Sequence, residues 1–232
     1  MNKTLVFIFL SVCSVTSFAD LRVITTPEIQ GDTLYIEGPI DSHIYNYFAY
    51  EYKALEGVNK VSLNSYGGNH YWALLTAEKI KDYGFTTIVE DGNFCASACV
   101  YLFGVGSERL LGDNAWLGVH GARISGGHVI TFRNLCPQEN FEQGLAQSQE
   151  CEEFLNNMFI TAMDATSEAF DLIESAGVSP EFREYYFSLN NDPNWYRFNN
   201  ILLKPDLVVN ADSALEFQLS TGSLRNRSLP IL

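Results

Sequence analysis

Apolar and polar positions follow two different periods along the first half of the chain. Short apolar or alternating runs predict strands at 33–37, 61–64 and 86–89. Between them, apolar residues recur every three or four positions over 44–55 and 72–83, which predicts two amphipathic helices. Strands that alternate with helices in this way are typical of an α/β domain with largely parallel pairing.

The next segment is rich in small residues and then returns to strand-like runs. Residues 96–103 predict a buried helix, and 109–111 and 115–119 predict two further strands. Gly112, Asp113 and Asn114 separate these strands and predict a hairpin turn.

One long amphipathic pattern dominates the second half. It predicts a helix over 151–176, with Gly177 as its C-cap and Pro180 in the first turn of the next helix. Residues 208–209 are compatible with a late strand. Because no repeat or linker divides the chain, we expect a single α/β domain.

The first nineteen residues have the order of a secretory signal peptide. Lys3 precedes an apolar stretch, and small residues occupy Ser17 and Ala19. We therefore expect cleavage after Ala19, a mature domain over 20–232, and a periplasmic or secreted location. An uncleaved membrane anchor is the alternative, although the stretch is short for a membrane span.

Charge and composition narrow the classes of partner. The 232 residues include 14 basic and 28 acidic side chains, for a net charge of −14, and 47% of the residues are hydrophobic. That apolar content can fill a core, which excludes disorder throughout. The acidic balance repels phosphate backbones, so we expect no nucleic-acid partner.

Cysteines point to disulfide bonds rather than a metal. After removal of the signal peptide, Cys95, Cys99, Cys136 and Cys151 remain, an even number in an exported chain. Without a C-x-x-C pair a zinc site is disfavoured, and we expect no metal or cofactor. Cys136 and Cys151 flank a polar segment that has little apolar content, which predicts a bond between them. For Cys95 and Cys99, a bridge and two buried thiols remain open, because a bridge within one helical turn is awkward.

Three features of the sequence are candidates for an active site. Gly67 and Gly68 follow a strand and precede a helix, where bare backbone N–H groups can meet a ligand, although most such pairs are only turns. Ser97 begins the predicted small-residue helix, as a nucleophile beside free N–H groups or simply as an N-cap. His120 ends a predicted strand and could act as a general base or serve as a structural histidine.

Together these features resemble the proteolytic subunit of the Clp protease, and most closely its exported, ATPase-free relatives. The resemblance covers 34–123, and the matching motifs are Gly38-Pro39-Ile40, Leu63-Asn64-Ser65-Tyr66-Gly67-Gly68, Ala96-Ser97-Ala98, Gly106 to Arg109, and Leu117 to His120. It implies a single-domain α/β fold, the Clp/crotonase β-β-α superhelix. It also implies a peptide or protein substrate and a homo-oligomer, and no ATPase partner is evident.

The resemblance also assigns roles to residues. It implies that Ser97 is the nucleophile and His120 the general base, with the backbone N–H groups of Gly67, Gly68 and Ala98 as the oxyanion hole. Two features depart from the family pattern. Tyr66 stands where the family usually has proline, and residues 124–151 form an insertion where the family's substrate-aligning strand and handle begin.

The third member of the triad is the least defined. The family places an aspartate after the long helix, where Asp192 is the best match and Asp206 the second. Asp171 falls inside the long helix and is expected to be a solvated charge. Such an aspartate would accept a hydrogen bond from His120 and fix its tautomer.

The remaining histidines are weaker candidates. His70 follows the glycine pair and could line the site, whereas His43 and His128 are expected on the surface.

Three functions compete at this point. The first is a serine peptidase that forms an acyl-enzyme, and the second is a catalytically silent binding or assembly protein of the same fold. The third, a crotonase-type acyl-CoA enzyme, is disfavoured because acyl-CoA is an intracellular substrate. The presence of both Ser97 and His120 favours the peptidase.

Overall fold

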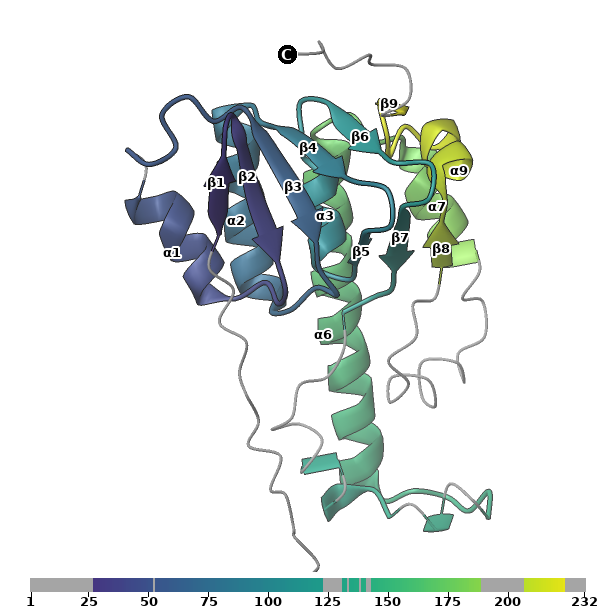
Figure 1. Cartoon of the computed structure of the whole chain (residues 1–232). Coiled ribbons are helices and arrows are strands. Elements are labelled where there is room, and N and C mark those ends of the chain that lie inside the picture. Colours follow the sequence, from purple (N-terminus) through teal and green to yellow (C-terminus); the bar gives the residue numbers. More distant parts are fainter. Residues whose placement is uncertain are drawn as a thin grey trace, which may run out of the picture.

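The computed structural model describes residues 27–51, 53–122, 131–132, 134–137, 139–140, 143–188 and 207–223 (Figure 1). The predicted signal peptide, 1–19, lies outside these ranges, and so does part of the predicted insertion, 124–151. Within the described ranges, no helix has the length and apolar character needed to cross a membrane.

A six-stranded sheet forms the centre of the domain, and its pairing confirms the predicted α/β class. From one edge to the other its strands are β1 (Glu28–Gln30), β2 (Thr33–Glu37), β3 (Lys60–Asn64), β4 (Thr86–Val89), β6 (Arg109–Leu111) and β9 (Gly222–Ser223). Among these described strands, only the edge pair β1–β2 is antiparallel. The parallel strands β2, β3 and β4 are linked by helices, as such connections require.

A second, three-stranded sheet lies beside the first. It consists of β5 (Phe94–Ala96), β7 (Trp116–Val119) and β8 (Leu207–Val209), with β5 parallel and β8 antiparallel to β7. The predicted hairpin at 112–114 is therefore wrong, because β6 and β7 belong to different sheets. Backbone N–H groups of Gly112 and Asn114 donate to Val89 O (2.8 Å) and Asp91 Oδ1 (3.1 Å), which holds the crossing segment against the end of β4.

Helices connect the strands, and side chains cap several of them. They are α1 (Ser42–Tyr50), α2 (His70–Tyr83), α3 (Cys99–Gly104), α6 (Gln149–Glu174), α7 (Pro180–Ser188) and α9 (Ala211–Glu216). Side chains of Asp41, Asn69, Ser148 and Asn210 cap four of their N-termini. Helix α1 ends at Tyr50, earlier than the predicted Leu55, because residues 53–57 form turns.

The long helix α6 has two different halves. Its C-terminal half packs on the body through Phe170 and Ile173, while its N-terminal half projects away from the sheets (Figure 1). At the projecting end, Cys151 is bonded to Cys136, the pairing that the sequence predicted.

Buried Arg109 joins the C-terminal segments to the main sheet. Its guanidinium group donates to the carbonyl oxygens of Gly106 (2.9 Å), Ala176 (2.9 Å) and Gln218 (3.0 Å). Burial lowers the pKa of this group below its usual value. Arg109 thus fixes the end of α6 and the turn before β9 to strand β6.

Candidate active site

Ser97 lies in a tight turn between β5 and α3. The sequence predicted a helix from 96, but strand β5 continues to Ala96 and α3 begins only at Cys99. Ser97 has φ +57°, a left-handed conformation that few residues other than glycine adopt. Pairing of β5 with β7 explains the difference, because the Ser97 N–H donates to Gly118 O at 2.7 Å and ends the strand there.

The glycine loop between β3 and α2 packs directly on this turn. A Cβ atom at Gly67, where φ is +96°, would lie 2.6 Å from both Ala96 O and Ser97 Cβ. A Cβ atom at Gly68 would lie 2.1 Å from Ile40 O. Both glycines are therefore required for close backbone approach, whereas the sequence predicted for them only bare N–H groups that could meet a ligand.

Hydrogen bonds decide which backbone N–H groups of this loop remain available to a ligand. The Gly67 N–H donates to Ser65 Oγ at 3.0 Å, and Gly67 O accepts from the Ile40 N–H at 2.9 Å. In the described part of the chain, no hydrogen bond engages the N–H of Gly68 or Ala98. Of the three predicted oxyanion-hole residues, Gly68 and Ala98 therefore retain N–H groups that could meet an anionic oxygen.

Tyr66, where the sequence departs from the Clp pattern, is supported by ring packing. Its ring lies 3.9 Å, centroid to centroid, from the ring of Phe94 in β5, and Phe94 stacks on Trp116 in β7 at 5.1 Å. Ring packing and the Ser65 hydroxyl together hold the segment that a proline would stiffen.

A disulfide encloses the serine turn. Cys95 of β5 and Cys99 of α3 are bonded to one another and are both fully buried. The sequence left this pair open between a bridge and two thiols. Because Cys95 belongs to a strand rather than to a helical turn, the geometric objection to a bridge disappears.

His120 follows directly after β7, the strand that pairs with β5. Its Nδ1 atom lies 2.6 Å from Gly121 O, and because a carbonyl only accepts, Nδ1 carries the proton in this bond. Two residues on, the Ala122 N–H donates to Thr166 Oγ1 of α6 at 2.9 Å. Thr166 therefore anchors the backbone that carries His120.

Strand register brings Ser97 and His120 to the same edge. Ala96 is paired with Gly118, so the serine turn and the histidine leave adjacent strands in the same direction. Among the described residues, no hydrogen bond joins Ser97 Oγ to the His120 ring. Such contacts are often long in unliganded enzymes and tighten when substrate binds.

The candidates for a third triad residue have different outcomes. Asp192 and Asp206 lie outside the described residues. Asp171 is exposed on α6 and forms an ion pair with Arg183 of α7, as expected for a solvated helical charge. His43 is exposed beside Asp41, and His128 lies outside the described residues.

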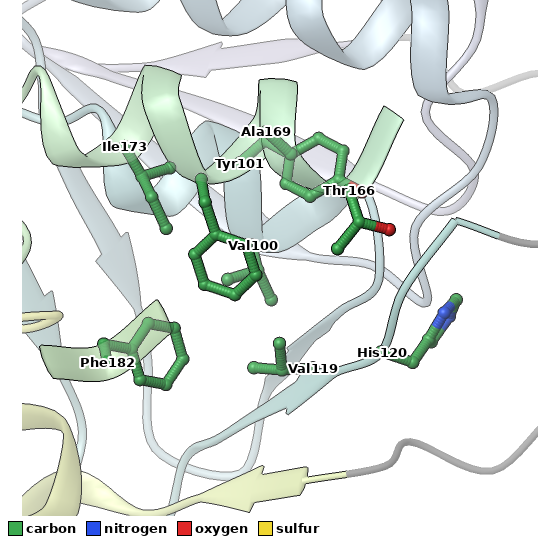
Figure 2. A pocket seen from close by; sticks show the side chains of 9 residues that line it. Val100, Tyr101, Val119, His120, Thr166, Ala169, Ile173 and Phe182 are labelled. Carbon is green, nitrogen blue, oxygen red and sulfur yellow. The ribbon is translucent and has the colours of Figure 1, made fainter. Parts of the chain in front are cut away.

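An apolar pocket opens next to His120 (Figure 2). His120 lies at one end, near the Thr166 hydroxyl, and Phe182 and Ile173 lie toward the other. The lining comes from α3, β7, α6 and α7: Val100, Tyr101, Val119, His120, Thr166, Ala169, Phe170, Ile173 and Phe182. Burial raises the pKa of Tyr101 to about 12, so its hydroxyl stays protonated at neutral pH.

His70 lies beside this pocket, at the start of α2. Its ring meets the ring of Tyr101 edge-on at 5.6 Å, and its Nε2 atom is 3.6 Å from Glu168 Oε2 of α6. The sequence named His70 as a lining candidate but gave no sign of Glu168, because that contact depends on how α6 packs.

Comparisons with known proteins support the fold. Neither a protein-family model nor a curated protein sequence matches the chain. Among solved structures, a ClpP1 variant from Listeria monocytogenes matches with a TM-score of 0.50 at 15% identity, over 85% of this chain and 93% of that one. The 1510-N membrane-bound stomatin-specific protease matches in two variants, with TM-scores of 0.47 and 0.46, both at 14% identity. These cover 83% and 86% of this chain, and 74% and 82% of theirs.

The ClpP1 match places the chain in the Clp-type α/β fold. The resemblance found in the sequence is thereby confirmed at the level of the fold.

Proposed function

We propose that the chain is an exported serine peptidase of the Clp type. One observation carries the proposal: Ser97 occupies a left-handed strand-to-helix turn, packed against a glycine loop, with His120 at the end of the paired strand. Strained backbone at a small nucleophilic residue is typical of functional sites. An ordinary N-cap serine would need no such conformation.

The proposed reaction has two acyl-transfer steps. Ser97 Oγ attacks the peptide carbonyl while its proton passes to His120 Nε2, and the Gly68 and Ala98 N–H groups stabilise the resulting oxyanion. His120 then gives that proton to the leaving amine, which breaks the C–N bond and leaves an ester on Ser97. Water, activated by His120, hydrolyses the ester and regenerates the serine.

The bond between His120 Nδ1–H and Gly121 O supports this role. It favours the neutral tautomer in which Nε2 carries the lone pair that a general base needs. A carbonyl can orient the ring, but it stabilises the imidazolium less than a carboxylate does. We propose that Asp192, with Asp206 as the alternative, is the carboxylate that supplies the remaining stabilisation of the protonated His120 ring.

Location and assembly complete the proposal. The predicted signal peptide and the two disulfides support a periplasmic or secreted protein. The Clp-type fold supports peptide or protein substrates and a homo-oligomer.

A catalytically silent binding protein is the second candidate. The observation in its favour is that Ser97 Oγ and His120 are not hydrogen-bonded. A fluorophosphonate probe distinguishes the peptidase from the binding protein, because it reacts only with an activated serine.

Wild type should be labelled and should hydrolyse peptides or esters, whereas Ser97→Ala should do neither while keeping its fold. His120→Ala should be damaged to a similar degree, and the two losses should not add. Asp192→Asn and Asp206→Asn identify the third residue by which of them lowers kcat. If wild type shows no Ser97-dependent labelling or turnover, the binding function replaces the peptidase.

A further inference from the structure

We propose that the Cys95–Cys99 disulfide is a positioning device for Ser97. This inference rests on the proposed function for its effect on rate, but its structural content can be tested separately. The bond joins the middle residue of β5 to the first residue of α3 and encloses only Ala96, Ser97 and Ala98.

The enclosed segment has a competing conformation. Alanine is the best helix former, and Ala96, Ser97 and Ala98 directly precede α3. Without a constraint, α3 could extend backwards by a turn and move Ser97 from φ +57° into the right-handed region. The left-handed conformation costs free energy at a serine, so helix extension would also relieve strain.

The disulfide is incompatible with that extension. In a continuous helix, residues four apart hold their Cβ atoms about 5–6 Å apart. A disulfide needs Cβ atoms about 3.5–4.5 Å apart. A bond between positions 95 and 99 therefore excludes a regular helical turn through Ser97.

The other restraints on the turn act mainly on one side of it. Hydrogen bonds from the Ala96 and Ser97 N–H groups to Ser65 O (2.9 Å) and Gly118 O (2.7 Å) fix the strand end. On the helix side, the Val100 N–H donates to Ser97 O at 2.9 Å, a bond that a longer helix could replace. The disulfide is the covalent tie between the two sides.

Loss of the tie should affect the reaction through geometry. The Ala98 N–H belongs to the same turn, so helix extension would displace both the nucleophile and one oxyanion donor. Misplacement by about 1 Å can cost on the order of a hundredfold in rate. Both cysteines are fully buried, so they would act on Ser97 without touching substrate.

A pair of double variants tests the proposal. Cys95→Ala/Cys99→Ala should lower kcat and the probe-labelling rate at least tenfold, with KM changed less than twofold. Cys136→Ala/Cys151→Ala, which removes the other disulfide far out on α6, should keep the wild-type labelling rate. A crystal structure of the first variant should show Ser97 outside the left-handed region.

Reversible reduction covers the case in which the first variant fails to fold. In Cys136→Ala/Cys151→Ala, the Cys95–Cys99 bond is the remaining disulfide of the described residues. A water-soluble phosphine reduces it to two thiols and is itself oxidised to the phosphine oxide. Labelling should fall as two thiols appear by mass spectrometry, and should return on reoxidation.

Different results would overturn the positioning role of the disulfide and the peptidase function. A wild-type labelling rate in the reduced protein or in Cys95→Ala/Cys99→Ala would overturn the positioning role. An unchanged φ at Ser97 in the crystal structure of that variant would overturn it too. If wild type is never labelled, the proposed function fails, while the crystal structure still decides whether the disulfide sets the turn.

Discussion

Replacing Ser97 by glycine and by alanine should give two inactive proteins of unequal stability. Both substitutions remove the nucleophile, but only glycine accepts φ +57° without steric cost. The left-handed conformation costs an L-residue roughly 1–2 kcal/mol. Part of this gain, roughly 0.5–1 kcal/mol, is lost because glycine gives the unfolded chain greater conformational freedom. Ser97→Gly should therefore exceed Ser97→Ala in unfolding free energy by about 1 kcal/mol.

Urea and thermal unfolding of the two variants measure this difference. For a chain of 232 residues, about 1 kcal/mol corresponds to roughly 2–4 °C in Tm. Wild type is the matched reference, because serine carries the same backbone strain as alanine. If Ser97→Gly proves less stable than Ser97→Ala by a similar amount, Ser97 has ordinary right-handed backbone and the strained-turn argument fails.

Three further perturbations test other parts of the structure. Thr166→Val keeps the side-chain shape but leaves the Ala122 N–H without its acceptor. Because this should displace His120, steady-state kinetics should show kcat lowered about tenfold. An unchanged kcat would show that Thr166 does not anchor His120. Arg109→Met leaves one buried and two partly buried carbonyl groups without this donor. It should lower the free energy of unfolding by about 1–3 kcal/mol in urea unfolding, and an unchanged value would contradict the anchoring role of Arg109. The Lys60 ammonium group lies 2.8 Å from the Asp32 carboxylate and lowers the pKa of Asp32. The pair therefore stabilises the fold at pH values above the usual aspartate pKa, and this stabilisation is lost as the pH falls through the lowered pKa. Asp32→Asn should flatten that part of the profile of stability against pH, and a profile identical to that of wild type would refute the coupling.

Local sequence patterns predicted most of the elements because each element carries its own signal. The helix over 72–83 corresponds to α2, and the strand over 86–89 to β4 with the same bounds. The cysteine pair 136–151 could be predicted because the segment between its members lacks the apolar residues to hold itself. In each case the decisive information lies within about twenty residues of chain.

The failures arise where pairing between distant segments overrides local preference. Alanine and serine at 96–98 favour a helix, yet the parallel pairing of β5 with β7 keeps the chain extended through Ala96. The segment 112–114 has hairpin chemistry, but its N–H groups bond to Val89 and Asp91 more than twenty positions earlier. No window of sequence around either segment contains the strand that decides its conformation.

The chemistry of the site follows the same division. Residue type and position beside predicted strands and helices made Ser97, His120 and the glycine pair candidates, and the resemblance to the Clp family implied their roles. Which N–H groups of the glycine loop remain available depends on Ser65, whose hydroxyl accepts from the Gly67 N–H, whereas no hydrogen bond among the described residues engages the Gly68 N–H. We therefore propose that Gly67 acts by letting Ser97 approach closely and that the Gly68 N–H is the oxyanion donor. If the Gly67 N–H were the oxyanion donor instead, Ser65 would have to release it. Ser65→Ala removes the hydroxyl that holds the Gly67 N–H, so it should weaken the turn, but it leaves the Gly68 N–H in place. If Gly68 is the donor, Ser65→Ala should therefore lower kcat far less than Ser97→Ala does.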